Sequence, residues 1–497
     1  MLFFMGDLLK KHAWLLACVA LIGVYGLTVP AVWQCEGVDE IEYLGLANSL
    51  LHGRGYVLDG QPHVLYPPLF PVFLSLVMKC FGATAWRWMY VANAFMGAMG
   101  LILMGSWIRR RFGEVGRWAA WFLLAAYYCW SFPARFLMSE PLYLPLSFGA
   151  VILAWRILER NGGKGWEYGL FGLCALLITM TRAAAISLAM ALFLAGMTRW
   201  ILSRKRAGLY IALLALMLGG GFFAYWSVRA DYIRPDAPES HWRWAKKYLG
   251  LSHEKQGIIA TGEELTEYSA KPFNRVVFCA VRYGQFVTSV VRIPPNYLPL
   301  ACGLFALFLT GLIRHWIAHP WSPIAWYTAV FLIMILMTTW LTNYHRLWFV
   351  LAPFLFLFLF EGLGWWARRG RVAELLLAVW GGWGLLWTFR NSFGLNAVQD
   401  IQVYVKGLYV ALALFYSVVL LWALAILFLK KRPGAIQPGR LAAIVWVLLV
   451  LQAGALVAIR FKMTLNNATV QQRNLQGLMH CGAWLQQNTP ADAHGLS

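Results

Sequence analysis

Four residues close to the start of the chain have types and a spacing that could support proton transfer. Glu36, Asp39, Glu40 and Tyr43 fall at positions i, i+3, i+4 and i+7, so a helix would place them on one face. They come directly after an apolar segment, at the point where a bilayer would meet water. An ionised carboxylate at such a boundary can accept a proton from an arriving hydroxyl or amine, if it lies within hydrogen-bonding reach.

A structural role explains part of the same pattern. Asp39 followed by Glu42 matches a capping box, in which the Asp39 side chain accepts hydrogen bonds from the first backbone N–H groups of a helix over residues 40–52. The two roles do not exclude each other. Asp39 is therefore predicted as a helix cap, as a general base, or as both.

Three further charged residues stand in apolar surroundings: Glu140 in MSEPLY, Arg182 in ITMTRAAAIS and Arg346 in TNYHRLWFVLAP. Ionisable groups at membrane depth cost about 2.5–3.5 kcal/mol each on insertion scales, so each needs a reason to be there. Glu140 could be an acid favoured by the dipole at a helix start, and Arg346 could extend to the lipid headgroups. Arg182 interrupts an apolar run, and a guanidinium there suits a phosphate approached from the lipid.

The composition of the chain identifies the environment of these residues. Of the 497 residues, 60% are hydrophobic and only 13% are charged, whereas soluble domains have about 45–50% and about 25%. This excludes a cytosolic globular enzyme, a disordered tail and a fibrous repeat. The net charge of +21 resides in short clusters between apolar runs and not in a basic stripe with interleaved aromatic residues, so nucleic acid is not an expected partner.

The apolar runs predict an all-α polytopic membrane protein, because a spanning helix needs about 20 predominantly apolar residues. We predict thirteen transmembrane helices, near residues 13–33, 86–108, 118–135, 141–158, 166–181, 183–202, 208–228, 296–313, 322–341, 347–364, 372–388, 404–428 and 440–459.

The basic clusters set the predicted orientation, since cytoplasmic loops hold an excess of Lys and Arg. The clusters alternate with apolar runs at Lys10-Lys11, Arg109–Arg111, Arg204–Arg206, Arg368-Arg369 and Lys430–Arg432. An odd number of spans then places the N-terminus in the cytoplasm and the C-terminus outside it. The candidate residues Asp39, Glu140, Arg182 and Arg346 all fall on the extracytoplasmic side.

This topology predicts one transmembrane domain over residues 1–460 and a short extracytoplasmic tail over 461–497. Two long outer loops are expected, at residues 34–85 and 229–295. Within the first loop, residues 40–52 and 67–81 are apolar at helical spacing but too short to span comfortably. We expect both to be helices that lie in the outer membrane interface.

Turn-forming residues separate these two interfacial segments, and Tyr43, Tyr66 and His63 are expected to line the substrate site. His63 and the outer acids could bind a divalent cation, although no spacing forces a metal site. Four cysteines could face an oxidising compartment, and the sequence does not fix their pairing. They are Cys35, Cys80, Cys279 and Cys481.

The acidic segment VDEIEYLGLANSLLHGRGY followed by LYPPLFPVFLSLVMKCFG resembles the polytopic GT-C glycosyltransferases. The similarity is greatest to the branch that contains protein mannosyltransferase-like and lipid A aminoarabinose transferase-like enzymes. Further matching segments are RRRFG, FLMSEPLYLPL, ITMTRAAAISL and YHRLWFVLAPFLFLFLFEGL, so the resemblance covers most of residues 1–370.

The resemblance implies specific roles for the candidate residues. Asp39 matches the acid of the first loop that acts as catalytic base in such enzymes, and Glu40 is its neighbour. Glu140 matches an acid of the second loop that helps to position the acceptor or a metal. Arg182 and Arg346 match basic residues near the donor phosphate.

Two departures from the family pattern bear on the substrate. The LYPPLFP segment lacks a basic residue where the aminoarabinose transferases have a phosphate-binding Lys, which weakens an aminoarabinose assignment. The soluble C-terminal domain that is common in the superfamily is nearly absent, which leaves recognition of the acceptor open.

The function implied is transfer of a sugar from a polyprenyl-phosphate carrier to an acceptor, with inversion, on the extracytoplasmic face of a bacterial inner membrane. The acceptor could be a glycan, a lipid or a protein. One alternative is a transporter or flippase of a lipid-linked or anionic solute, since charges inside the membrane also mark transport paths. However, the sequence shows no internal repeat of the kind typical of transporters. Another alternative is a non-catalytic assembly subunit.

Overall fold

The computed structural model describes residues 14–23, 29, 38–58, 60–82, 86–129, 137–233, 298–337 and 344–367. Regular structure within these ranges is helical apart from a small antiparallel hairpin, β1 (Val57–Leu58) paired with β2 (Gln61–Pro62). The predicted helical class is therefore confirmed for this part of the chain. The last three predicted spans, most of the second long loop and the tail lie outside the described residues.

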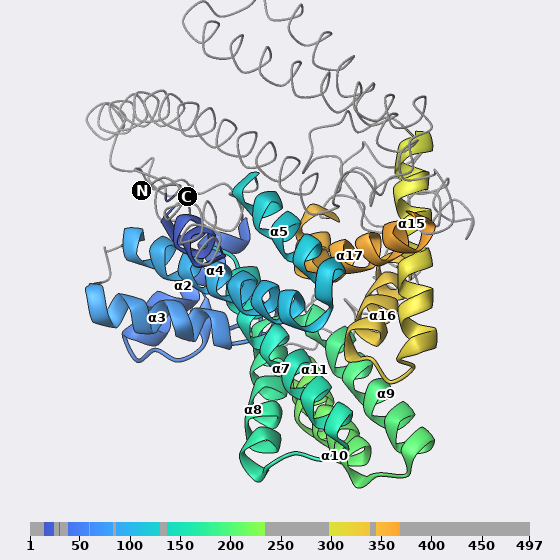
Figure 1. The fold of residues 1–497 in the computed structure, drawn as a ribbon. Coiled ribbons are helices and arrows are strands. Elements are labelled where there is room, and N and C mark those ends of the chain that lie inside the picture. The colour runs from blue at the N-terminus through green and yellow to red at the C-terminus, as the bar shows by residue number, and fades with distance from the viewer. Residues whose placement is uncertain are drawn as a thin grey trace, which may run out of the picture.

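The first group of helices comprises α2 (Val38–Leu51), α3 (Leu69–Phe81), α4 (Trp86–Arg111) and α5 (Gly113–Cys129). The helices α2 and α3 correspond to the two segments that were expected to lie in the membrane interface. They pack against each other, and α3 also contacts α4. In Figure 1 they are the two neighbouring blue helices next to α4.

A second group follows: α7 (Glu140–Arg160), α8 (Gly165–Thr181), the short 3₁₀ helix η1 (Ala183–Ala185) and α9 (Ile186–Ser203). The next helix has three parts, α10 (Arg206–Leu214), the π-helical segment η2 (Ala215–Gly220) and α11 (Gly221–Ile233). The last group comprises α15 (Leu298–Ala318), α16 (Pro323–Met337) and α17 (Tyr344–Ala367). Its members appear in yellow and orange in Figure 1, where α16 stands beside α9.

Four described helical segments are long and apolar enough to cross a membrane: Trp86–Arg111, Glu140–Arg160, Ala183–Ser203 and Arg206–Arg229. Each coincides with a predicted span. The apolar run over residues 166–202 divides at Thr181 and Arg182, as predicted, because the backbone of Arg182 is extended between α8 and η1 (φ −152°, ψ 143°).

The basic turns of the chain meet at one end of the bundle. Arg111, at the end of α4, forms an ion pair with Glu159, at the end of α7. Arg199 of α9 donates a hydrogen bond of 2.9 Å to the carbonyl of Leu158. Its guanidinium also lies 4.7 Å from the ring centroid of Trp321, in the turn between α15 and α16. Four turns that the sequence predicts to be cytoplasmic loops therefore lie together at one end of the helical bundle.

Helix α7 separates this basic end from the candidate site. It has 21 residues, which span about 31 Å at about 1.5 Å per residue, close to the thickness of the hydrocarbon core of a bilayer. Glu140 begins the helix and Arg160 ends it. The two ends therefore lie about one bilayer thickness apart.

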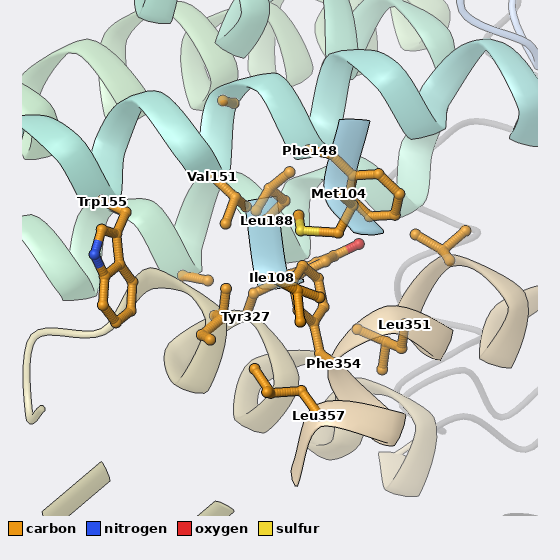
Figure 2. Close-up of a cluster of buried hydrophobic side chains, with 14 of the residues drawn as sticks. Met104, Ile108, Phe148, Val151, Trp155, Leu188, Tyr327, Leu351, Phe354 and Leu357 are labelled. Carbon is orange, nitrogen blue, oxygen red and sulfur yellow. The ribbon is translucent and has the colours of Figure 1, made fainter. Parts of the chain in front are cut away.

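The main hydrophobic core fills the space between α4, α7, α9, α16 and α17. Figure 2 shows Met104 and Ile108 of α4 facing Phe148 and Val151 of α7, with Phe354 and Leu357 of α17 on the other side. Aliphatic and aromatic side chains interlock here, so these helices form one packed unit. A second, smaller core joins α2 and α3 to the starts of α4 and α7.

Helices α9 and α10 cross at two glycines with their backbones almost in contact. A Cβ atom on Gly208 would lie 2.5 Å from the carbonyl oxygen of Gly196, and one on Gly196 would lie 2.6 Å from the carbonyl oxygen of Gly208. No side chain fits at either position. Close packing of small residues is a typical source of stability between membrane helices.

Replacing Gly208 with alanine is expected to lower the free energy of unfolding by about 1–3 kcal/mol, because the new methyl group must push the two helices apart. The matched control is Gly169→Ala in α8, where a Cβ would meet no atom within 4 Å. There alanine should stabilise the helix by up to about 1 kcal/mol. Denaturant unfolding of the detergent-solubilised protein measures both effects, and equal changes would contradict the close crossing.

Candidate functional site

Asp39 lies in the first turn of α2 and is bound by a tyrosine from the following loop. The hydroxyl of Tyr66 donates a hydrogen bond of 3.0 Å to Oδ1 of Asp39, and the carboxylate is partly exposed. The helix begins at Val38, so Asp39 is inside the first turn and not at the N-cap position that a capping box requires. An acid in the first turn is still favoured by the helix dipole.

His63 and Tyr56 hold Tyr66 in place. The backbone N–H of Tyr66 donates to Nε2 of His63 at 3.0 Å, and the two rings stack with centroids 5.3 Å apart. The hydroxyl of Tyr56 donates to the Tyr66 carbonyl at 2.8 Å. Because Nε2 of His63 acts as an acceptor, this imidazole is neutral in the structure. Buried His63 therefore supports Tyr66 directly.

Tyr43 links Asp39 to the start of α7. Its ring lies 4.6 Å from that of Tyr66, and its hydroxyl is 3.5 Å from the hydroxyl of Ser139, its hydrogen-bond acceptor. Burial raises the pKa of Tyr43 to about 12, the Ser139 hydrogen bond lowers it, the charges of Glu140 and Asp39 raise it, and Arg182 lowers it. The phenol is therefore neutral at ordinary pH and lies within the electric field of all three charged residues.

Glu140 and Arg182 form a buried ion pair. Nη1 of Arg182 lies 2.7 Å from Oε1 of Glu140, and their side chains are 15% and 2% exposed. Glu140 is the first residue of α7, and Arg182 directly follows the end of α8. An anion at a helix N-terminus and a cation at a helix C-terminus are each favoured by the helix dipoles. The pair therefore joins two helix ends of opposite polarity.

Glu40 occupies different surroundings from its neighbour Asp39. Its side chain is fully buried and accepts hydrogen bonds from the hydroxyl of Tyr90, in α4, and from the backbone N–H of Leu137 at 3.4 Å. The spacing pattern predicted that Asp39 and Glu40 share a face. The structure separates them, because adjacent helical residues project about 100° apart. Of the two carboxylates, only that of Asp39 reaches the surface.

The structure brings together most of the predicted site residues. Asp39, Tyr43 and Tyr66 are linked through Ser139 to the Glu140–Arg182 ion pair, and we call these six residues the Asp39 site. Three segments supply them: α2 with its following loop, the start of α7, and the break between α8 and α9. They all lie at the end of α7 opposite to its basic end.

Two predicted residues cannot be placed with the others. Arg346 lies in the first turn of α17, and its side chain is outside the described part of the structure, as is the whole of Glu36. Among the described residues, no three His, Cys, Asp or Glu side chains come together as metal ligands. Cys80 is a free, exposed thiol, whereas Cys35, Cys279 and Cys481 fall outside the described ranges.

The sequence interpretation missed several residues that build the site. Ser139 could have been found, since a serine directly before Glu140 and Pro141 is a typical helix start. Tyr90 has no distinguishing sequence signal. Trp226 and Arg229 of α11 contact the loop that carries Tyr66, and only the fold brings them there.

Comparisons with known proteins support the fold. No family model and no curated sequence matches this chain. The crystal structure of ArnT from Cupriavidus metallidurans bound to undecaprenyl phosphate aligns with 97% of this chain and 82% of its own, at 16% identity and a TM-score of 0.56. The same protein in the apo state covers 93% and 78%, at 15% identity and a TM-score of 0.53.

The archaeal oligosaccharyltransferase AglB from Archaeoglobus fulgidus aligns with 84% of this chain and 56% of its own, at 14% identity. Its TM-score of 0.42 is too low to support an argument. The two ArnT comparisons show that this chain has a fold similar to that of ArnT. At this identity, the activity has to be argued from the site itself.

Replacing Glu140 with glutamine should lower the free energy of unfolding by about 3–5 kcal/mol, because it leaves the Arg182 guanidinium buried without its counter-charge. The double variant Glu140→Gln/Arg182→Gln should recover much of this loss. Glu114→Gln is the matched control, since the Glu114–Arg117 pair is largely exposed (70% and 54%) and should be worth about 0–1 kcal/mol. Thermal and denaturant unfolding measure the loss of stability in each variant. Equal losses in Glu140→Gln and Glu114→Gln would show that the buried ion pair contributes no more to stability than the exposed one.

Proposed function

We propose that this protein is a membrane glycosyltransferase that transfers a sugar from a polyprenyl-phosphate carrier to an acceptor, with inversion at the anomeric carbon. The observation that carries the proposal is the arrangement of the Asp39 site. A partly exposed carboxylate and a guanidinium are connected through Tyr66, Tyr43, Ser139 and Glu140 at one end of the helical bundle. The solved ArnT structure of similar fold holds undecaprenyl phosphate, which supports a polyprenyl-linked donor.

The site is proposed to face the extracytoplasmic side of a bacterial inner membrane. The argument is the positive-inside rule, because Arg111, Arg160 and Arg199 all lie at the opposite end of the bundle. The N-terminus would then be cytoplasmic and the C-terminal tail extracytoplasmic. A carrier lipid could enter with its isoprenoid chain between the helices and its phosphate at the break between α8 and α9.

The proposed reaction is a single displacement. The carboxylate of Asp39 accepts the proton of the acceptor hydroxyl or amine, while the acceptor atom attacks the anomeric carbon. The bond between that carbon and the phosphate oxygen breaks, and its electron pair leaves with the polyprenyl phosphate. Attack from the face opposite to the leaving group inverts the anomeric configuration.

Arg182 has the position and chemistry to stabilise the leaving phosphate. A guanidinium can bind two phosphate oxygens at once, and cations placed where charge develops lower the barrier without a general acid. Glu140 orients Arg182 through the ion pair of 2.7 Å. We assign Arg346 as a second phosphate ligand on its match to the family pattern, and Tyr43, Tyr66 and His63 to the wall of the substrate site.

Asp39→Asn tests the proposed base. Asparagine keeps the size of the side chain and can still accept a hydrogen bond from Tyr66, but it cannot take up the proton, so turnover should fall by about 10²–10⁴-fold. The assay offers membranes a panel of radiolabelled polyprenyl-phosphate hexoses and pentoses and follows release of label from the lipid. Near-normal turnover in the folded variant would eliminate Asp39 as base. Movement of the intact lipid-linked sugar across vesicles, without consumption, would instead support a flippase.

Arg182→Lys tests the proposed phosphate contact. Lysine keeps the charge but loses the planar, two-point geometry, at a cost of about 1.5 kcal/mol or more for a charge-assisted hydrogen bond. The KM for the lipid-linked donor should therefore rise about tenfold, with little change in the KM for the acceptor. Equal changes in both KM values would argue against a specific contact with the donor.

A further inference from the structure

Helix α11 holds the loop that joins α2 to α3. The indole Nε1 of Trp226 donates a hydrogen bond of 2.9 Å to the carbonyl of Val64, across 162 residues of sequence. One turn later, Nη1 of Arg229 lies 3.4 Å from the carbonyl of His63. Two consecutive carbonyls of the loop therefore have donors on the same face of one helix.

The indole of Trp226 is fixed on several sides. The side chain is buried, and its ring stacks on Phe222 and contacts the edge of Tyr56, with both centroid distances 5.8 Å. The guanidinium of Arg229 lies 4.6 Å from the ring centroid, in the range of a cation–π contact. Held by these neighbours, the indole directs its N–H at the carbonyl of Val64.

The π-helical segment before α11 sets the direction in which Trp226 projects. Segment η2 covers Ala215–Gly220, directly before α11. A residue inserted into a helix rotates all later side chains by about 100° around the axis. Single π turns of this kind occur frequently at functional sites. The turn thus places Trp226 and Arg229 on the side where the loop lies.

Continuous contacts connect Trp226 to Asp39. Val64 is bonded to Trp226 and directly follows His63. Nε2 of His63 accepts a hydrogen bond of 3.0 Å from the backbone N–H of Tyr66, and the imidazole stacks on the phenol ring of Tyr66. The Tyr66 hydroxyl then donates to Asp39 at 3.0 Å. Displacing the loop by a fraction of an ångström would move the Tyr66 hydroxyl, which donates to the Asp39 carboxylate.

We propose that Trp226 is a positioning residue for the transfer reaction: through Val64, His63 and Tyr66 it sets the orientation of the Asp39 carboxylate. The proposal rests on the function proposed above. Trp226 itself touches neither substrate nor the reacting atoms. The role differs from simple packing, because it predicts that the effect of Trp226 on catalysis passes through Tyr66.

The first test compares two matched tryptophans. Trp226→Phe removes the N–H donor to Val64 and keeps an aromatic ring. Trp326→Phe removes an equivalent bond, from Nε1 of Trp326 to the carbonyl of Pro320 at 2.9 Å, in the turn at the basic end. Trp226→Phe should lower kcat for the labelled polyprenyl-phosphate sugar by about tenfold, because small misplacements of a reacting group are costly. The KM for the acceptor should change by less than about twofold, and Trp326→Phe should leave kcat unchanged.

Hydrogen exchange supplies a readout that needs no activity. In Trp226→Phe, the backbone amides of His63 and Tyr66 should exchange at least several-fold faster than in the wild type, because the loop loses a tether. In Trp326→Phe their exchange should be unchanged. Unchanged exchange in Trp226→Phe would overturn the proposal, even where kcat falls.

A double-mutant cycle with Tyr66→Phe tests the route. If Trp226 acts through Tyr66, adding Trp226→Phe to Tyr66→Phe should lower kcat by less than about twofold further, instead of by about tenfold. Fully additive losses would overturn the proposed route. Failure of the proposed function has a different signature: the wild type then consumes no polyprenyl-phosphate sugar, while the exchange experiment still decides whether Trp226 holds the loop.

Discussion

The arrangement of the site depends on the buried ion pair between Glu140 and Arg182. Each partner stands at a helix end, Glu140 where α7 begins and Arg182 where α8 stops, so the local dipoles favour the two charges before they meet. Once such a pair is buried, removing either partner leaves an uncompensated charge and is strongly destabilising. The pair therefore ties the start of α7 to the break between α8 and α9, and it holds a guanidinium beside Tyr43 and Ser139.

Helix α7 gives the molecule its two chemically different ends. Its first residue carries the ion pair, and its last turn carries Arg156 and Arg160, which share the buried carboxylate of Glu167 at 3.3 and 3.7 Å. Between these ends the helix is almost entirely buried against apolar neighbours. The Asp39 carboxylate and the Glu140–Arg182 ion pair are thus confined to one end, about one bilayer thickness from the basic turns.

Helix packing places the two adjacent carboxylates of α2, those of Asp39 and Glu40, in different surroundings. Glu40 is enclosed by α4 and the residues before α7, where its Oε1 accepts hydrogen bonds from Tyr90 and from the Leu137 amide, and these bonds tie α2 to its neighbours. Asp39 projects toward the loop between α2 and α3 and stays partly exposed. The position of Tyr66, which donates a hydrogen bond to Asp39, depends in turn on His63 and on the donors of α11. The loop between α2 and α3 supplies the hydrogen-bond donor to the Asp39 carboxylate. Helix α11 contacts this loop and can therefore influence the position of that donor.

Local sequence patterns were sufficient to predict the helical class, the helix break at Arg182, the positions of α2 and α3, and the placement of Asp39, Glu140 and Arg182 on one side. These features depend on local apolar length and on charge alternation, which are properties of short segments. Three features became visible only in the folded chain: Asp39 is partly exposed while Glu40 is buried, Ser139 joins Tyr43 to the ion pair, and Trp226 donates a hydrogen bond to Val64. Such contacts join residues up to 162 positions apart. They depend on how helices cross and on single π-helical turns, for which the sequence has no local signal.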